Sequence, residues 1–391
     1  MNANVTENTV RSKLHLNKTV ILLFTLFISC TEFFPYISKI FYFPLVVVFV
    51  LYLYTITFKP TLKLHVIFYG FFLSFFSTIL FLTKNNINGL LFFPIIAWFT
   101  YIVLLYSIKD KEIKKSFDCF LKCIVVFILA FSLLEILIKL NFVSFDYYSD
   151  FVKNYGDRRF DVLRTRVLWG SSLSSAAVGI FLTFYFSLVR KDFAFLSLTF
   201  LYITLTGGRT GIVLFILMLF ISLTKSWNFW RFKLSRKNVM LLMAMVPCLI
   251  FSITWLLDTR VGDIVSRSFT IKADSSFTGR GDTTGVVFEK LLLSLPESLF
   301  WGLLENDWVS DSAFTSIAAQ SGILLLISFL GYLFFLLFKT TLDAITKMTF
   351  VVVSIIGSWT IGDFFIPAVT FLYAITFLIY EKNTTCYYRP K

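Results

Sequence analysis

The chain has 391 residues, of which 57% are hydrophobic and only 15% are charged. Soluble domains are about 45–50% apolar and about 25% charged. Because much of a chain this long would face water in a soluble fold, the composition excludes a soluble fold and predicts a lipid-facing surface. The net charge of +13 would suggest nucleic acid in a soluble protein, but its distribution along the chain follows membrane topology, so no nucleic-acid partner is expected.

The N-terminal region begins with basic residues and continues into an apolar run. Arg11, Lys13 and Lys18 precede residues 19–37, a run that is long for a signal-peptide core and lacks a small-residue cleavage site. We therefore expect a retained first transmembrane span.

Apolar runs of membrane-spanning length recur along the rest of the chain, since about 20 helical residues cross the hydrocarbon core. The last run, 348–380, is too long for one span and is divided by Gly362, Asp363 and Pro367. The seventh and eighth runs are short, so a re-entrant hairpin is the alternative there. The sequence predicts an all-α integral membrane protein of about 12 helices, at 19–37, 40–58, 64–83, 89–108, 117–138, 170–189, 190–206, 210–224, 238–257, 312–338 and the two halves of 348–380.

Lysine and arginine concentrate in alternate connecting segments. The segments that this pattern assigns to the cytoplasm hold most of the basic residues, whereas the short external loops hold only Lys39, Lys84 and Arg209. The positive-inside rule then places both termini in the cytoplasm. Residues 1–391 form a single polytopic domain with two long external segments, 139–169 and 258–311, and long loops of this kind are usually functional.

The first external cluster contains four arginines, Arg158, Arg159, Arg164 and Arg166, followed by Gly170. External bases are mostly arginine and cytoplasmic ones mostly lysine. Topology requires only positive charge, while guanidinium groups also grip phosphate oxygens in a bidentate fashion. The cluster suits a lipid-linked phosphate or pyrophosphate, and the alternative is snorkelling to lipid headgroups.

A second cluster is the turn Thr206-Gly207-Gly208-Arg209-Thr210-Gly211 between two apolar helices. Glycine lets the backbone approach a ligand closely, and the N-terminus of the next helix offers unpaired N–H groups and a positive dipole. With Arg209 there, the sequence predicts an anion site at the outer interface. A plain tight turn is the alternative.

The third cluster combines Arg280 with the tryptophans and acids Trp301, Glu305, Trp308 and Asp311. Aromatic faces and carboxylates are typical of sugar-binding surfaces, and a carboxylate can act as general base toward a hydroxyl. The alternative is that Asp311 or Ser312 caps the tenth span.

Few polar groups fall inside the predicted spans. Glu32 and Glu135 are the notable acids, and Lys139 lies one turn after Glu135 as a structural partner. The cysteines show no metal-ligand spacing and the two histidines, His15 and His65, fall on the cytoplasmic side, so we expect no metal and no cofactor.

With these motifs in this order, the chain resembles the Wzy-type O-antigen polymerases, and more broadly the O-antigen polymerase/ligase superfamily of membrane glycosyltransferases. Arg159 and Gly170 are separated by ten residues, as in the family's arginine–glycine pattern in the third periplasmic loop. The fifth loop departs from that spacing and leaves its key arginine open between Arg267 and Arg280; Arg280 is favoured because "TGRGD", "PESLFWG" and "DSAFTSIAAQSG" follow the family order. "GGRTG" at Arg209 resembles its arginine-containing turn.

The resemblance implies polymerisation of undecaprenyl-pyrophosphate-linked oligosaccharide repeat units at the periplasmic face of the bacterial inner membrane, in lipopolysaccharide biosynthesis. The catalytic set would be Arg159, Arg209 and Arg280, with Asp311 or Glu305 as the base. Membrane lipid, a chain-length regulator and the flippase of the same pathway are the other expected partners. The substrate-binding set would be Arg158, Arg164, Arg166, Gly170, Trp301 and Trp308.

Three other functions remain open. An O-antigen ligase would transfer glycan to lipid A-core, but that family is expected to carry a histidine in its large periplasmic loop, and this chain has none there. A lipid-linked oligosaccharide flippase or transporter predicts charged residues lining the spans. A non-catalytic scaffold would not require arginine- and tryptophan-bearing loops.

Overall fold

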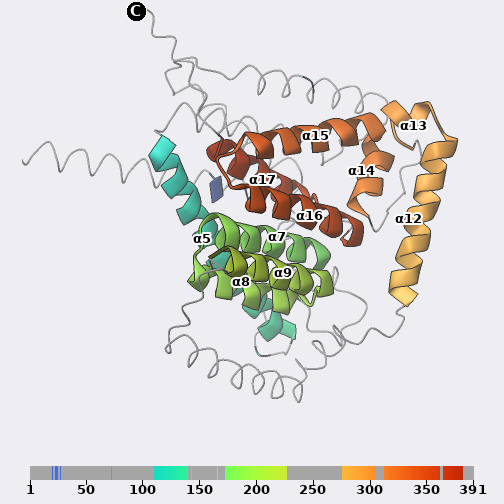
Figure 1. Cartoon of the computed structure of the whole chain (residues 1–391). Helices are drawn as coiled ribbons and strands as arrows, with labels where there is room; N and C mark the ends of the chain where they lie inside the picture. Colours follow the sequence, from blue (N-terminus) through green and yellow to red (C-terminus); the bar gives the residue numbers. More distant parts are fainter. Residues whose placement is uncertain are drawn as a thin grey trace, which may run out of the picture. The chain divides into compact units, whose positions relative to one another are not determined.

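The computed structural model describes residues 20, 23–24, 27, 72, 110–139, 142, 165, 172–226, 275–303, 312–361 and 364–381, without the side chains of 110–113, 139, 209, 226, 275–283 and 367. These ranges are helical, and the one β interaction within them is an isolated bridge between Thr340 and Glu381. The helices (Figure 1) are α5 (Asp110–Lys139), α7 (Ser172–Phe184), the π-helix η2 (Tyr185–Val189), α8 (Phe193–Thr206), α9 (Arg209–Ser226), α12 (Ser275–Leu293), α13 (Glu297–Phe300), α14 (Ala313–Ser321), α15 (Ile323–Lys339), α16 (Ala344–Thr360) and α17 (Pro367–Ile379).

The chain divides into two compact units. Unit 1 gathers 1–123, 283–351 and 365–391, and unit 2 gathers 124–282 and 352–364. Helices α5, α12 and α16 therefore each contribute residues to both units.

Aromatic side chains form the core where α15, α16 and α17 meet in unit 1. Phe350 is fully buried and packs edge-on against Tyr373 and Phe377, at centroid distances of 4.8 and 4.9 Å. The adjoining ends are pinned, because the N–H of Thr341 donates to the carbonyl of Tyr380 over 2.7 Å. The α15–α16 turn is thus fixed to the residues that follow α17.

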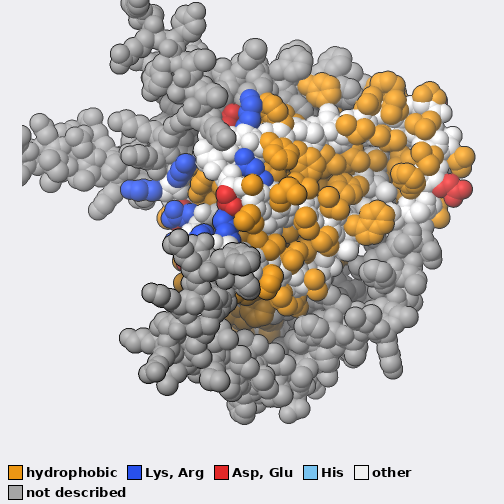
Figure 2. Space-filling model, viewed as in Figure 1, with side chains coloured by type: hydrophobic (Ala, Val, Ile, Leu, Met, Phe, Trp, Pro, Cys, Tyr) orange, Lys and Arg blue, Asp and Glu red, His pale blue; other side chains and the backbone are white. Residues whose placement is uncertain are grey.

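Lysines mark this same end of unit 1. Lys347 donates from its ammonium group to the carbonyls of Phe338 and Thr340, at the C-terminus of α15, where cations are favoured by the helix dipole. Lys114, near the start of α5, lies 4.8 Å from the Tyr380 ring centroid. Figure 2 shows the contrast along α15: apolar side chains cover its exposed surface toward α13, and basic side chains lie toward its other end.

Glycines hold the opposite end of α15 against α13. Gly322 separates α14 from α15 with φ 91°, and an added Cβ there would meet the backbone of Phe300. Gly302 follows α13 with φ 73°, against the carbonyls of Ala318 and Ala319. Both backbones approach too closely for any side chain, so α13 is fastened to the break between α14 and α15.

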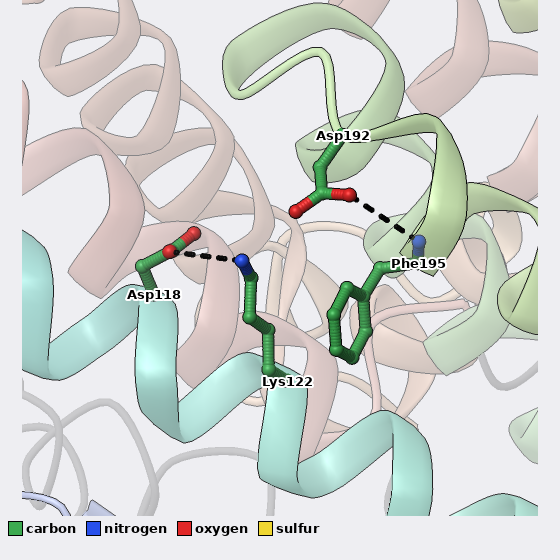
Figure 3. Close-up of polar contacts among 4 residues, drawn as sticks. All are labelled: Asp118, Lys122, Asp192 and Phe195. Carbon is green, nitrogen blue, oxygen red and sulfur yellow. Dashed lines mark hydrogen bonds and ion pairs between the residues drawn. The ribbon is translucent and has the colours of Figure 1, made fainter.

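Three neighbouring helices, α7, α8 and α9, pack together in unit 2. Between η2 and α8, Lys191 takes a left-handed φ of 58° and Asp192 caps α8 by accepting from the Phe195 N–H at 3.4 Å (Figure 3). In the unit 1 part of α5, Asp118 and Lys122 form an i,i+4 ion pair at 3.5 Å (Figure 3). Such caps and pairs fix helix starts and faces locally.

Small residues let α7 and α8 pack closely. Gly179 faces Ile203, whose Cγ1 would lie only 2.5 Å from an added Cβ, and both residues Ala176 and Ala177 are fully buried. At the far end, the Ser222 hydroxyl of α9 donates to the Ser187 carbonyl of η2 over 2.8 Å. Close helix contact through small residues and cross-helix hydrogen bonds is the packing mode of helices in lipid.

The all-helical prediction is confirmed over the described ranges, and the expected divide within 348–380 lies between α16 and α17. Two helical stretches, Lys114–Ile138 and Ser172–Val189, are long and apolar enough to cross a membrane, and shorter apolar helices accompany them. One expectation was wrong in detail, because the span at 312–338 is broken at Gly322. Within the predicted external segment 258–311, the described residues include α12 and α13. The spans expected at 40–58, 89–108 and 238–257 lie outside the described residues.

Candidate functional site

The turn between α8 and α9 has the form that its glycines predicted. Gly207 adopts a left-handed φ of 63° and ends α8, its N–H donating to the Thr204 carbonyl at 3.1 Å. Arg209 is then the first residue of α9. The first N–H to bond within α9 is that of Ile212, to Gly208 at 3.1 Å, so the N–H groups of the first three residues point out of the helix end.

The starts of α7 and α9 lie side by side. An added Cβ on Gly208 would be 2.9 Å from the Ala176 Cβ, and one on Gly211 would be 3.4 Å from the same atom. Because Ser222 contacts Ser187 at their other ends, the two helices run parallel. Both therefore direct their positive dipole ends to the same side, where an anion is favoured.

Thr165, which lies between two arginines of the first cluster in the sequence, contacts this end. The N–H of Thr165 donates to the carbonyl of Leu205 in the last turn of α8, at 3.0 Å. Thr165 is fully buried, and its hydroxyl has no hydrogen-bond partner among the described residues. Arg164 and Arg166 are its neighbours in the sequence.

A buried polar layer lies one turn below, and of its residues the sequence singled out only Glu135. Tyr202 of α8 is fully buried, and Ser175 of α7 and Glu135 of α5 are near enough to interact with its hydroxyl. Glu135 itself is 2% exposed. The sequence signals for this layer were the polar pair Ser174-Ser175 in one apolar segment and Tyr202 in the next. The predicted partner Lys139 lies outside the described side chains.

The third cluster is described in part. Arg280 lies in α12, within the part of that helix whose side chains are not described. Trp301 directly follows α13 and is half-buried, with its ring 6.4 Å from that of Phe300. Ser312 stands at the start of α14 but makes no side-chain cap there, so the capping alternative is wrong for Ser312.

The other predicted site residues lie outside the described residues, and so does the side chain of Arg209. They are Arg158, Arg159, Arg164, Arg166, Gly170, Glu305, Trp308 and Asp311.

The chain was compared with protein-family models, curated proteins and solved structures. None of them matches it. The chemistry of the site therefore depends on the geometry above. Among the described side chains, no three His, Cys, Asp or Glu residues gather as metal ligands would.

The arrangement at this end can bind an anion. Two parallel helix starts, a glycine turn between α8 and α9, and an arginine at the first helical position all favour negative charge. The segment that carries Arg164 and Arg166 is attached to the same end through Thr165. Sequence analysis predicted the arginines and the turn separately, and the described contact between their segments is the hydrogen bond from Thr165 to Leu205.

Proposed function

We propose that this protein is an O-antigen polymerase of the bacterial inner membrane, with its active site on the periplasmic side. In the reaction, a hydroxyl of the incoming lipid-linked repeat unit attacks the anomeric carbon of the growing glycan. The bond from that carbon to the pyrophosphate oxygen breaks as the new glycosidic bond forms. The hydroxyl proton passes to a carboxylate, and undecaprenyl pyrophosphate leaves with the electron pair.

Exposed apolar residues at helical spacing support a membrane location. On α9, Val213, Ile216 and Phe220 are 59%, 50% and 64% exposed, and they lie on one face of the helix. On α16, Met348 and Trp359 are similarly exposed. Contiguous apolar faces of this kind are rare on soluble monomers, because exposing them to water is unfavourable. The composition predicts that lipid covers these faces.

The ends of α7, α8 and α9 support the orientation. Arg190, Lys191 and Lys225 lie at the end where η2 and α9 finish, and Arg209 with its glycine turn lies at the other end. Under the positive-inside rule the lysine-bearing end faces the cytoplasm. The anion site then faces the periplasm, where lipid-linked repeat units are joined.

The observation that carries the proposal is the hydrogen bond between Thr165 and Leu205. Thr165 lies between Arg164 and Arg166 in the sequence, and Leu205 is in the last turn of α8, just before the turn that leads to Arg209. The bond therefore supports a common site for the two arginine motifs. A pyrophosphate leaving group needs several positive groups as its charge develops. Arginines from two segments beside two helix starts supply them without a metal.

The remaining roles follow the sequence motifs. Arg159, Arg209 and Arg280 neutralise the departing pyrophosphate, and Asp311 or Glu305 accepts the proton of the attacking hydroxyl. Trp301 and Trp308 provide faces for sugar rings.

Deletion of the gene, read on a lipopolysaccharide gel, separates the candidate functions. Loss of a polymerase leaves core carrying a single repeat unit. Loss of a ligase leaves polymer on undecaprenyl, and loss of a flippase leaves no extended glycan. Either of the last two outcomes would refute the polymerase proposal.

Substitution of Arg209 tests the site. We expect Arg209→Ala to reduce long-chain polymer about 100-fold or more, since lost stabilisation of developing charge typically has that effect, and Arg209→Lys to restore only part of it. Arg190→Ala is the matched control, because Arg190 is exposed at the opposite end of the same helices. Long-chain polymer at the normal level in Arg209→Ala, with equal protein in the membrane, would refute the site.

A further inference from the structure

The segment 292–301 forms an apolar tip on the outside of unit 1. Leu293 at the end of α12 is 78% exposed, and Leu292, Leu295 and Phe300 are between 43% and 49% exposed. The name apolar tip refers below to these four residues, which lie in a segment predicted to be a periplasmic loop. A water-exposed loop would be expected to present polar residues at such positions.

The apolar tip is held in one conformation. Ser298 is fully buried, its hydroxyl donating to the Leu291 carbonyl and its N–H to the Ser294 carbonyl at 3.1 Å. Val287 and Leu291 of α12 pack on Ala318 and Ala319 of α14. The exposed leucines and Phe300 are therefore displayed by a fixed support, and their exposure is a property of the fold.

The length of α15 places the apolar tip at a definite depth. Its 17 residues, at about 1.5 Å per residue, separate Lys339 at the basic end from Gly322 by about 25 Å. The hydrocarbon core of a bilayer is about 30 Å thick. Phe300 packs its backbone on Gly322, so if Lys339 lies at the cytoplasmic boundary, Phe300 lies inside the outer leaflet.

The exposed side of α12 fits the same placement. Figure 1 shows the unit 1 part of α12 running across the direction of α15, as a helix lying along a membrane surface would. Glu289 is exposed, and at 100° per residue it lies opposite the buried pair Val287 and Leu291. Val286 and Phe288 are also exposed on this side of α12, and Leu293 lies one turn beyond Glu289 on the same face. The exposed side of α12 is thus apolar around a single acid, and it continues into the apolar tip.

We infer that the apolar tip is inserted among the acyl chains of the outer leaflet, so that the fifth periplasmic loop is anchored in lipid. This inference depends on the membrane location and orientation in the proposed function, and not on the polymerase reaction. Insertion would hold the loop that carries Arg280 at the bilayer surface, the level at which the pyrophosphate of a lipid-linked substrate lies.

Fluorescence quenching by brominated lipids tests the insertion. Full-length protein without its native cysteines receives Leu293→Cys or Phe300→Cys, is labelled with a bimane fluorophore, and is placed in phosphatidylglycerol nanodiscs brominated near the headgroup or near the chain end. We expect several-fold stronger quenching than at the control Thr341→Cys, an exposed polar position after the basic end of α15, and stronger quenching by the shallow bromines than by the deep ones. Thr341→Cys should react readily with a membrane-impermeant maleimide.

Two results would overturn the inference. Absence of quenching with rapid maleimide reaction at Leu293 and Phe300 would mean that the tip faces water. Absence of quenching with no reaction would mean that protein covers it. Failure of the proposed polymerase site would be seen separately, as a normal level of long-chain polymer in Arg209→Ala. That result would leave the quenching at Leu293 and Phe300 unchanged.

Discussion

At the scale of single residues, the contact between Gly179 and Ile203 decides how closely α7 and α8 approach. We expect Gly179→Ala to cost about 1–3 kcal/mol of stability, because the new methyl meets Cγ1 of Ile203 in a packed interior. Ile203→Ala alone should cost about 2–5 kcal/mol as a cavity. The double variant should cost at least about 1 kcal/mol less than the sum, since the two changes relieve each other.

Thermal unfolding in detergent, followed by intrinsic fluorescence, measures this cycle. Strict additivity of the two substitutions would contradict the close contact.

Residues also show where sequence reasoning reached its limit at the site. Gly207 and Arg209 were predicted in their turn, because a left-handed glycine before a helix start is a local property. The bond from Thr165 to Leu205 spans 40 residues of sequence, and no local pattern encodes it. Tyr202 was missed for a related reason: its polar neighbours Ser175 and Glu135 come from two other helices.

At the scale of elements, the break between α14 and α15 can be tested with two glycines of the same apolar run. Gly322→Ala should destabilise the protein by about 3 kcal/mol or more, because an L-residue is strained at φ 91° and its Cβ meets the Phe300 backbone. Gly331→Ala should be neutral or stabilising by up to about 1 kcal/mol, since nothing lies within 4 Å. Comparable unfolding temperatures for the two variants would show that the break is not fixed by Gly322.

The helices themselves divide into those that sequence could predict and those that it could not. Apolar runs with basic or proline boundaries, such as α9 and α17, were located to within a few residues. The run at 312–338 was taken as continuous because hydropathy does not register backbone φ at Gly322. Helix α12 was missed because its glycines and charges at 279–282 resemble a loop, whereas its stability comes from packing on α14.

At the scale of the whole molecule, each unit should present its two ends to opposite sides of the membrane. In intact cells, an impermeant maleimide should label Thr210→Cys and Gly285→Cys in a cysteine-free background, and should label Arg190→Cys and Thr341→Cys only after the membrane is opened. Thr210 and Arg190 lie at the two ends of unit 2, and Gly285 and Thr341 lie at the two ends of unit 1. Labelling of Arg190→Cys from outside would reverse the orientation.

The division of the chain between the units has a consequence for biosynthesis. Helices α7, α8 and α9 follow one another directly, so they can associate as soon as α9 has left the ribosome. The aromatic core around Phe350 lacks Tyr373 and Phe377 until α17 has been translated. With the proposed membrane location, α15 and α16 enter the bilayer before α17 covers that face, so a nascent chain stalled before residue 367 should be the form that membrane proteases and insertion chaperones recognise.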